Sequence, residues 1–395
     1  MISLIGIGPG APDAMTLEAE AAIREADLLI GAARMLGSLP AHTGGEAVAY
    51  RPSDILEILE RERPERPCVL YSGDPGFWSG AEALISVLRE RKLEYRILPG
   101  LSSVQVLAAR LGRSWKDWAL VSAHGQDGAL LSRLNAGRPV FLLTDGSNGP
   151  ASLCRTLTEA GLPGLTVTVG ENLSYPGERI VTGTAKELAG RTFAPLNAVL
   201  VEPAPVCPQR VPGIPDDAFL RGETPMTKQE VRAVILAKLA VKPSDLCWDI
   251  GAGTGSVSVE LAMQGKAVWA VEYDEKACGL IRKNRERFCA WNLHLIRGRA
   301  PDALDGLPKP DKVFIGGSEG RLRPILRKAT EGENPVRVCV SAITLETVGK
   351  AMEEMESLSL GPEVTQISVS RTKKVGGKHL LLARNPVFLI TGGRP

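Results

Sequence analysis

The chain has 395 residues, of which 44% are hydrophobic and 23% charged, with a formal net charge of +2. Such a length exceeds one ordinary hydrophobic core and predicts two domains, and the balanced charge argues against a polyanion-binding surface. No apolar run reaches the roughly 18 residues needed to cross a bilayer, and no basic leader precedes the first strand-like run, so we expect neither a membrane span nor a signal peptide. Seven cysteines without a C-x-x-C pair and four scattered histidines favour a cytoplasmic protein without a disulfide scaffold or a metal site.

The first 204 residues alternate strand-like and helical runs, which predicts an α/β domain with a mostly parallel sheet. Ser79 with Glu82, and Ser102 with Gln105, have the spacing of capping boxes that open helices. The predicted strands lie at 2–7, 27–30, 68–72, 94–98, 138–146 and 165–173, and the first two helices at 16–25 and 53–62.

Three glycine-bearing loops follow strands in this half. The first, "GIGPGAP" (6–12), is not a phosphate cradle, because Pro9 removes an amide and no helix follows promptly. Alone it reads equally well as a plain turn. Two further loops, "YSGDPGFWSG" (71–80) and "PGLSSVQ" (99–105), also lie at predicted strand ends. Three such loops could converge on one cleft.

The segment 202–225 carries six prolines and almost no periodic apolar pattern, which is typical of a linker. We therefore predict a first domain over 1–204, a linker over 205–221 and a second domain over 222–395.

The second domain begins with a predicted helix opened by a capping box, Thr227 with Glu230. Strands are expected at 246–250, 267–271, 293–296, 312–315 and 336–341, followed by an antiparallel hairpin of 363–370 with 378–384. This pattern predicts a doubly wound α/β sheet whose ligand binds at a topological switch point near the first strand.

A glycine-rich turn follows that strand in "WDIGAGTGSVSVELA" (248–262). Glycines let the backbone approach a ligand, and Glu272, at the end of the next strand, is placed to accept both hydroxyls of a ribose. A dinucleotide fingerprint would have Gly or Ala where Ser256 stands, and Asp249 is suited to reach a cationic amino group directly or through water. The features together favour S-adenosylmethionine over NAD, although a glycine turn alone can occur without any ligand.

With "MTKQEVRAVILAKL", "AVEYD", "RGRAPDAL" and "DKVFIGGSEG", this half resembles the C15-methylating, decarboxylating methyltransferases of corrin biosynthesis. In "GGSEG" (316–320), a glycine in place of Glu319 would look more familiar. The resemblance implies a class I methyltransferase fold and an S-adenosylmethionine pocket formed by Thr227, Gly251, Ala252, Gly253, Thr254, Gly255, Glu272 and Ala300.

The three loops of the first half, with "VSAHGQDG" (121–128), "VGENLSYPGERIVTGTAKELAG" (169–190) and "PLNAVLVE" (195–202), resemble the C5-methylating branch of the tetrapyrrole methylases. Ala11 stands where relatives often carry Asp. The resemblance implies two α/β subdomains that bind a second, folded S-adenosylmethionine. It places the contacts at Pro9, Ser72, Gly73, Asp74, Phe77, Ser102, Ser103 and Gly170.

Together the halves resemble bifunctional enzymes that methylate a reduced precorrin at C5 and C15 and decarboxylate its ring C acetate in cobalamin synthesis. An electron-rich bridge carbon can take a sulfonium methyl without a covalent enzyme intermediate, so the protein mainly positions its reactants. The expected partner is a small-molecule precorrin rather than nucleic acid or membrane, and we expect a homo-oligomer. Whether the substrate holds cobalt, and which methylation comes first, stay open.

The carboxylates of such a substrate call for basic side chains. We take His124, Lys228 and Arg232 as candidates for substrate contact or proton transfer, although His124 could equally be a loop residue without a role. Trp78 could form a cleft wall or pack in the core. Further basic candidates are Arg299, Arg321, Arg323, Lys373 and Lys374.

Two other functions fit parts of the pattern. RNA methylation would favour a basic stripe with interleaved aromatic residues, whereas aromatic residues make up only 5% of this chain. A non-catalytic module that merely binds S-adenosylmethionine is the other possibility, and it would show cofactor binding without methyl transfer.

Overall fold

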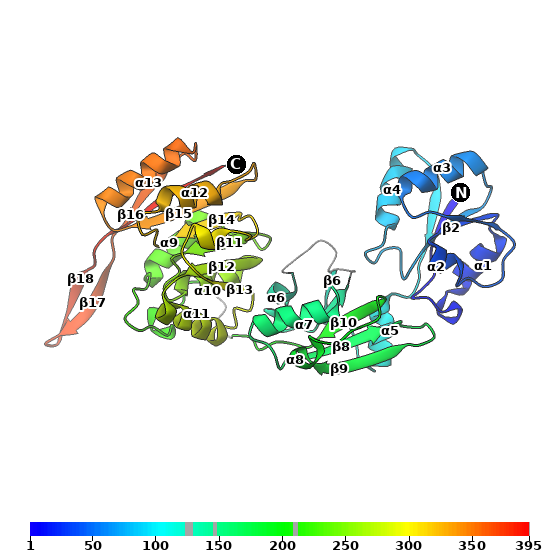
Figure 1. Ribbon diagram of the computed structural model, residues 1–395, viewed down its shortest axis with the longest axis horizontal. Coiled ribbons are helices and arrows are strands. Elements are labelled where there is room, and N and C mark those ends of the chain that lie inside the picture. Colours follow the sequence, from blue (N-terminus) through cyan, green and yellow to red (C-terminus); the bar gives the residue numbers. More distant parts are fainter. Residues whose placement is uncertain (123–128, 145–147, 208–211, 395) are drawn as a thin grey trace. The chain divides into compact units, whose positions relative to one another are not determined.

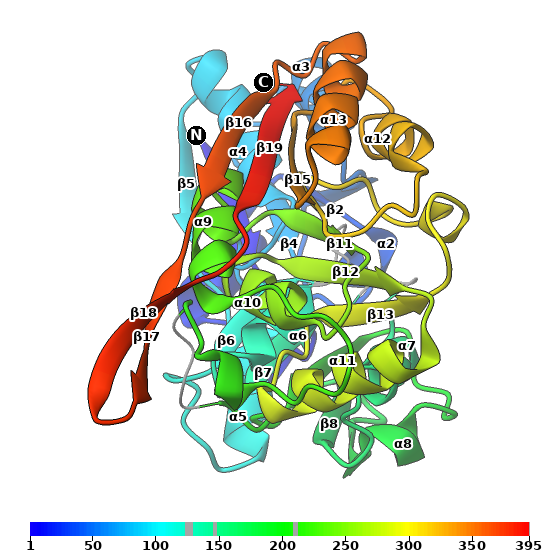
Figure 2. The same cartoon turned by 90° about the vertical axis from the view of Figure 1, so that its left-hand side faces the viewer.

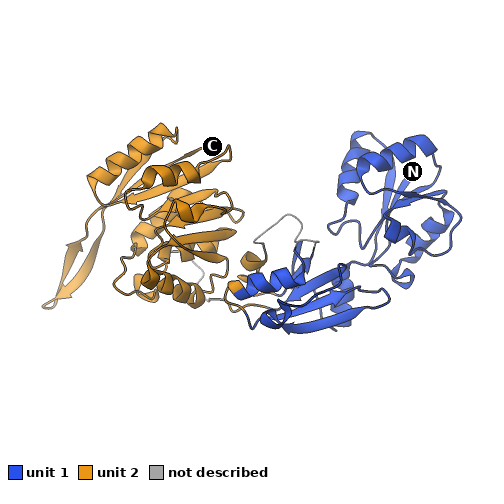
Figure 3. Cartoon of the chain, viewed as in Figure 1, with its two compact units in different colours: residues 1–126, 139–158, 163–202 blue, residues 127–138, 159–162, 203–395 orange. Residues whose placement is uncertain are grey.

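The computed structural model describes residues 1–122, 129–144, 148–207 and 212–394 (Figure 1, Figure 2). The chain divides into two compact units, coloured separately in Figure 3. Unit 1 comprises residues 1–126, 139–158 and 163–202, and unit 2 comprises residues 127–138, 159–162 and 203–395. Among the described residues, no helix combines the length and apolar character of a membrane span.

The first sheet of unit 1 is entirely parallel, in the order β3-β2-β4-β1-β5. Its strands are β1 (Ile2–Gly6), β2 (Leu28–Gly31), β3 (Gly45–Val48), β4 (Pro67–Tyr71) and β5 (Tyr95–Leu98). Helices α1 (Leu17–Glu25) and α2 (Ala33–Leu36) pack on one face, and α3 (Pro52–Glu62) and α4 (Ala81–Glu90) on the other. Because both faces are covered, the three inner strands β1, β2 and β4 are buried along their whole length, whereas the edge strands β3 and β5 are largely exposed.

The second sheet of unit 1, in the order β6-β7-β10-β8-β9, pairs in parallel only between β6 and β7. The prediction of a mostly parallel sheet is therefore right for the first sheet and wrong for this one. Its strands are β6 (Ala119–Ser122), β7 (Val140–Leu143), β8 (Thr166–Glu171), β9 (Arg179–Thr184) and β10 (Asn197–Val201). The neighbouring helices in sequence are α5 (Ser103–Arg110), α6 (Ala129–Leu134), α7 (Pro150–Glu159) and α8 (Ala185–Leu188).

Unit 2 has a seven-stranded sheet in the order β13-β12-β11-β14-β15-β19-β16, which confirms the doubly wound α/β prediction. Strands β11 to β15 are parallel, and β19 is antiparallel to both of its neighbours. The parallel strands are β11 (Leu246–Ile250), β12 (Ala267–Glu272), β13 (Leu293–Arg297), β14 (Lys312–Ile315) and β15 (Val336–Ala342).

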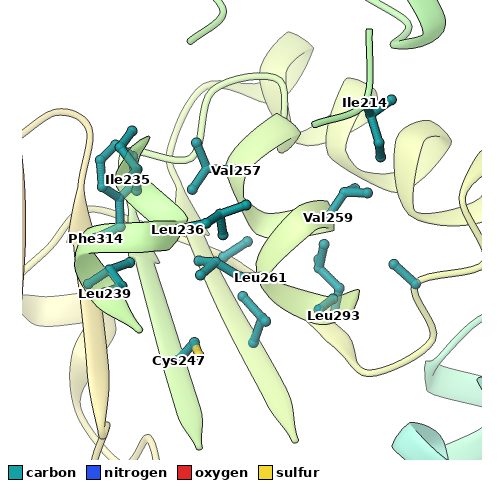
Figure 4. Close-up of a cluster of buried hydrophobic side chains, with 14 of the residues drawn as sticks. Ile214, Ile235, Leu236, Leu239, Cys247, Val257, Val259, Leu261, Leu293 and Phe314 are labelled. Carbon is teal, nitrogen blue, oxygen red and sulfur yellow. The ribbon is translucent and has the colours of Figure 1, made fainter. Parts of the chain in front are cut away.

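Hydrophobic cores lie on both faces of this sheet. One contains α9 (Gln229–Leu239), α10 (Ser256–Gln264) and α11 (Glu275–Arg287), whose apolar side chains meet Cys247, Leu293 and Phe314 of the strands (Figure 4). The other contains α12 (Leu322–Ala329) and α13 (Leu345–Ser357). The sheet is thus covered on both sides, and the carboxyl ends of its parallel strands remain free for a ligand.

The C-terminal hairpin differs from its prediction. Strand β17 (Ser370–Val375) pairs with β18 (Lys378–Ala383) in a separate two-stranded sheet that extends away from the main sheet (Figure 2). The earlier part of the predicted arm, β16 (Glu363–Ile367), pairs instead with β19 (Val387–Arg394), a strand that the sequence pattern did not reveal. Strand β19, near the end of the described chain, therefore lies between β15 and β16 in the main sheet.

Only one of the three predicted capping boxes forms. Ser102 and Gln105 make theirs at the start of α5. The Ser79 box is wrong because α4 begins at Ala81 after Gly80, and the Ser79 hydroxyl accepts from the Ala81 amide. The Thr227 box is also wrong: α9 begins one residue later than expected, and Asp216 accepts from its first amide, that of Gln229 (2.9 Å).

Candidate active sites

A cavity of about 600 Å³ opens in unit 2 at the carboxyl ends of β11, β12 and β14. This is the switch point of the sheet, where β11 lies between strands reached by chain crossovers in opposite directions. The predicted cofactor residues that line it are Thr227, Gly251, Ala252, Gly253, Thr254, Glu272 and Ala300. Side chains outside the prediction also line it, among them Thr224, Pro225, Ser341 and Ile343.

The glycine-rich loop after β11 has a left-handed backbone at Gly251 (φ +71°), Gly253 (+57°) and Gly255 (+76°). A Cβ on Gly251 would lie 2.7 Å from the backbone nitrogen and oxygen of Gly317, so the loops after β11 and β14 touch through bare backbone. Gly255 does not line the cavity; it caps α10, and a Cβ there would lie 3.1 Å from Ile281. The glycines thus let the chain itself pack closely around the cavity floor.

Glu272 ends β12 and points its carboxylate into the loop. Oε2 accepts from the Gly253 amide (2.9 Å), and Oε1 accepts from the Tyr273 (2.8 Å) and Asp274 (3.0 Å) amides. A carboxylate offers about four acceptor positions, and the three amides occupy three of them, so one position remains for a ribose hydroxyl. The donor set therefore fits an adenosyl group, and the Thr254 hydroxyl, buried without a partner among the described residues, adds a further unused polar atom.

Asp249 does not line the cavity, so the direct contact with a cationic amino group is wrong, whereas the alternative contact through water stays a prediction. It is 0% exposed in β11; one oxygen accepts from the Ser258 hydroxyl, and the other has no partner in the described part of the chain. Burial raises the pKa of Asp249 from 3.8 to about 7, against the lowering effect of the Ser258 hydrogen bond. The residue is a buried acid beneath the glycine loop.

This raised pKa predicts a pH-dependent effect of Asp249→Asn. At a pH between its pKa in the unfolded chain and its pKa in the folded chain, the Asp249 carboxyl holds its proton only in the folded state. Its contribution to the free energy of unfolding of the wild type therefore falls as pH rises from about 4 to about 7. The neutral amide does not lose stability in this way. The difference in unfolding free energy between Asp249→Asn and wild type should therefore grow by about 2–3 kcal/mol in favour of the variant between pH 5 and pH 8. Urea unfolding of the full chain, with unit 2 followed through mass spectrometry of its peptides, measures this difference. A difference in unfolding free energy that stays constant between pH 5 and pH 8 would contradict the prediction.

The basic candidates separate into two groups. Lys228, Arg299 and Arg321 line the cavity. Arg323 instead pairs with Glu354 (3.3 Å), and Lys373 and Lys374 lie on exposed β17. His379 lies on β18, also exposed.

The prediction that Arg232 contacts substrate or transfers a proton is wrong, because Arg232 does not line the cavity as Lys228 does. Lys228 is the N-cap of α9 and lies outside its helical turns, whereas the Arg232 side chain is 0% exposed. Its guanidinium donates to Glu260 (2.8 Å), to Asp216 (2.9 Å) and to the backbone oxygens of Ile214 and Thr227. Arg232 thus fastens the proline-rich segment, through Ile214 and Asp216, onto the core of unit 2.

A second cavity, of about 190 Å³, lies in unit 1 and is lined from both of its sheets. The predicted residues Pro9, Ser72, Gly73, Asp74, Phe77, Ser103 and Gly170 line it, whereas Ser102 is buried at the start of α5. Residues outside the prediction come from the second sheet and its loops: Leu143, Leu173, Leu196, Asn197 and Ala198. Three of these, Leu196, Asn197 and Ala198, belong to the segment "PLNAVLVE" (195–202). The sequence signal that could have identified them is a loop that leads directly into a strand.

The three glycine loops of unit 1 meet through their backbones. Gly8 and Gly73 exchange amide hydrogen bonds (3.3 and 2.7 Å), and a Cβ on Gly100 would lie 2.4 Å from the Gly73 oxygen. Asp74 accepts from the amides of Gly76 (2.8 Å) and Gly100 (3.2 Å). The loops therefore converge on one cleft, with Asp74 tying two of them together.

Trp78 is 50% exposed and lines this cavity, so it forms part of a wall rather than of the core. Its ring contacts Phe77 edge-on, with centroids 4.7 Å apart. His124 lies outside the described residues, and its suggested role stays a prediction.

Comparison with known proteins assigns a protein family to each part of the chain. A family model of tetrapyrrole (corrin/porphyrin) methylases matches residues 1–189, and a model of the precorrin methyltransferase domain matches residues 217–392. The chain is therefore a methyltransferase, using S-adenosylmethionine, that joins a domain of the tetrapyrrole methylase fold to a doubly wound one.

The chain is 32% identical over 386 residues to the precorrin-6Y C(5,15)-methyltransferase [decarboxylating] of Sinorhizobium sp, covering 95% of this chain and 92% of the relative. It belongs to the family of precorrin-6Y C5,15-methyltransferases. A probable cobalt-precorrin-6B C(15)-methyltransferase (decarboxylating) of Pyrobaculum calidifontis is 43% identical over 189 residues, which are 47% of this chain and 97% of that protein. A crystal structure of precorrin-6Y C5,15-methyltransferase from Geobacter metallireducens GS-15 is 39% identical, covers 46% of this chain and 96% of its own, and gives a TM-score of 0.44.

Proposed function

We propose that this chain methylates a reduced precorrin at C5 and C15 and removes the carboxylate of its ring C acetate, a step in cobalamin synthesis. The observation that carries the proposal is the pairing of two separate cavities, each lined by the residues expected for an S-adenosylmethionine site. Similarity to the Sinorhizobium enzyme over 95% of the chain supports the same reaction. We assign methylation of C15, with decarboxylation, to unit 2, because the precorrin methyltransferase domain lies at 217–392 and the Pyrobaculum C15-methyltransferase matches only about half of the chain. Methylation of C5 is then assigned to unit 1.

In unit 2 the cofactor would be held by the loop from Gly251 to Thr254 and by Glu272, with Thr227 and Ala300 completing the pocket. Bound S-adenosylmethionine supplies a sulfonium methyl to a carbon nucleophile. In unit 1, Pro9, Ser72 to Asp74, Phe77, Ser103 and Gly170 would hold a second molecule.

The side chains of the unit 2 cavity suit the remaining steps. Lys228, Arg299 and Arg321 would neutralise and orient substrate carboxylates, which brings the reacting carbon into place without a covalent intermediate. Apolar walls from Ile250, Val271, Phe314 and Val387 exclude water. When the ring C acetate loses carbon dioxide, the electrons of the broken carbon–carbon bond pass into the conjugated iminium of the macrocycle and the former acetate carbon takes up a proton. Loss of a carboxylate charge is easier in such a dry site.

Product analysis of the full chain tests this function. The full chain is given precorrin-6Y and methyl-labelled S-adenosylmethionine, and the product is examined by NMR while carbon dioxide is collected. We expect label at two bridge carbons and one carbon dioxide per macrocycle. A product with label at other positions, or bound cofactor with no methyl transfer, would refute the proposal, and the latter would favour a binding module.

We further propose that the enzyme is a homo-oligomer of the cytoplasm. Cys68, Cys154, Cys247, Cys278 and Cys339 are buried free thiols, as expected in a reducing compartment, and Leu380, Leu381 and Leu382 are exposed on the β17–β18 hairpin. Sedimentation of the purified chain at the mass of a single copy would contradict the assembly, and recovery of the enzyme from an oxidising compartment would contradict the location.

A further inference from the structure

Glu319 lies on the wall of the unit 2 cavity between two arginines. Its Oε2 is 2.6 Å from the Arg299 guanidinium and 3.8 Å from that of Arg321, and all three residues line the cavity. Arg321 has a second acidic neighbour, Asp302 at 3.7 Å, which does not line the cavity. The cavity therefore contains a carboxylate of the protein held against two of its cationic side chains.

The backbone at this position is unusual for glutamate. Glu319 has a φ of +47°, in the left-handed region that residues with a Cβ rarely adopt, and Gly320 follows at +80°. Disfavoured conformations of this kind gather at functional sites, where surrounding contacts maintain them. At Glu319 the ion pair with Arg299 is such a contact.

Arg299 is itself held in place from its other side. Its guanidinium carbon lies 4.0 Å from the centre of the Tyr273 ring, within the range of a cation–π contact. Tyr273 also lines the cavity, at the end of β12 beside Glu272. The Tyr273 ring thus gives Arg299 a contact that does not depend on the Glu319 carboxylate.

Lys228, the third cationic side chain of the cavity, differs from Arg299 and Arg321 in its partners. Lys228 forms no ion pair with any residue within the described ranges, so its ammonium is available to an incoming anion. Arg299 and Arg321 already have a carboxylate partner of the same chemistry that a substrate acetate or propionate would offer. Guanidinium binds any carboxylate in the same forked manner, so the two carboxylates compete for the arginines.

We propose that Glu319 is an internal competitor that occupies Arg299 and Arg321 until a substrate carboxylate displaces it. The inference rests on the proposed function, because it takes the substrate to be a polycarboxylated tetrapyrrole. Arg299 and Glu319 are both substantially exposed, so the ion pair is weak enough to exchange. The exchange favours a ligand whose other carboxylate reaches Lys228 over a small monocarboxylate anion, and Glu319 thereby sets the affinity of the site.

Glu319→Gln tests this directly, because it keeps the length and backbone of the side chain and removes its charge. We expect the KM for precorrin-6Y, measured from carbon dioxide release, to fall about two- to five-fold, with kcat and the KM for S-adenosylmethionine unchanged. The matched control is Glu331→Gln, which removes an exposed carboxylate paired with Lys309 (2.7 Å) outside the cavity and should match wild type. In an Arg299→Gln background the effect of Glu319→Gln should shrink, as expected of two groups that interact.

A KM that is unchanged or raised in Glu319→Gln would overturn the proposal, since Glu319 would then be neutral or would serve to position the arginines. Fluorescence titration of the full chain with uroporphyrin III, a stable octacarboxylic tetrapyrrole, gives a readout that needs no turnover. Tighter binding by Glu319→Gln than by Glu331→Gln supports competition, and equal binding contradicts it. Failure of the wild-type chain to methylate precorrin-6Y would count against the proposed function, and the comparison of the two variants would still decide the role of Glu319.

Discussion

Gly251→Ala is expected to lower kcat/KM for carbon dioxide release by more than about 100-fold. The added Cβ would lie 2.7 Å from two backbone atoms of Gly317, and the backbone at Gly251 has a φ of +71° that alanine disfavours. Neither strand end can give way easily, because β11 and β14 pair in register up to Ile250 and Ile315. The loop that lines the cavity must move instead, and a displacement of about 1 Å is enough for a loss of this size.

The matched control for Gly251→Ala is Gly279→Ala on α11. A Cβ on Gly279 would have no atom of another segment within 4 Å, and alanine favours a helix by about 1 kcal/mol over glycine. Gly279→Ala should therefore retain wild-type activity. Steady-state assays of both variants measure the effect, and carbon dioxide release by Gly251→Ala within tenfold of wild type would show that the loop does not form the cofactor site.

Arg232→Met is expected to destabilise unit 2 by about 3–5 kcal/mol. Arg232 and Glu260 are both fully buried, and removing the guanidinium leaves the carboxylate without its counter-charge in the core. The change also removes one of the partners of Asp216, which accepts from the first amide of α9 and keeps its ion pair with Arg371 (3.4 Å). Because the guanidinium donates to the Thr227 oxygen beside the cavity, the proline-rich segment and the cavity wall should loosen together.

Hydrogen exchange of the α9 and α10 amides, with urea unfolding of unit 2, measures this destabilisation. The exposed pair of Lys309 and Glu331 (2.7 Å) supplies the control, and Lys309→Met should cost less than about 1 kcal/mol. Replacing Glu260 by Gln in the Arg232→Met chain should recover part of the stability, because the unpaired buried charge is then gone. Equal losses for Arg232→Met and Lys309→Met would contradict the buried network.

The features that could be predicted from the sequence are those set by short spacings. Gly251, Gly253 and Glu272 were found because a strand, a turn and the next strand end lie within about 20 residues and converge at one sheet edge. The loops of unit 1 at Gly73 and Ser103 were found for the same reason. In each case the fold brings together segments whose order along the chain already indicates their meeting point.

The features that were missed depend on distant segments. Arg232 was taken with Lys228 as a candidate for substrate contact or proton transfer, but the acids that hold its buried guanidinium lie 16 and 28 residues away in the sequence. Strand β19 contains two glycines and pairs with β15, about 50 residues earlier. Asp249 was expected to face a ligand, yet burial along β11 placed it beneath the loop.

Calorimetric titration of the purified full chain with S-adenosylmethionine most directly tests whether one chain carries two independent donor sites. We expect two equivalents bound per wild-type chain and a single equivalent per Gly251→Ala chain. A wild-type stoichiometry of one, or two equivalents still bound by the variant, would contradict this expectation.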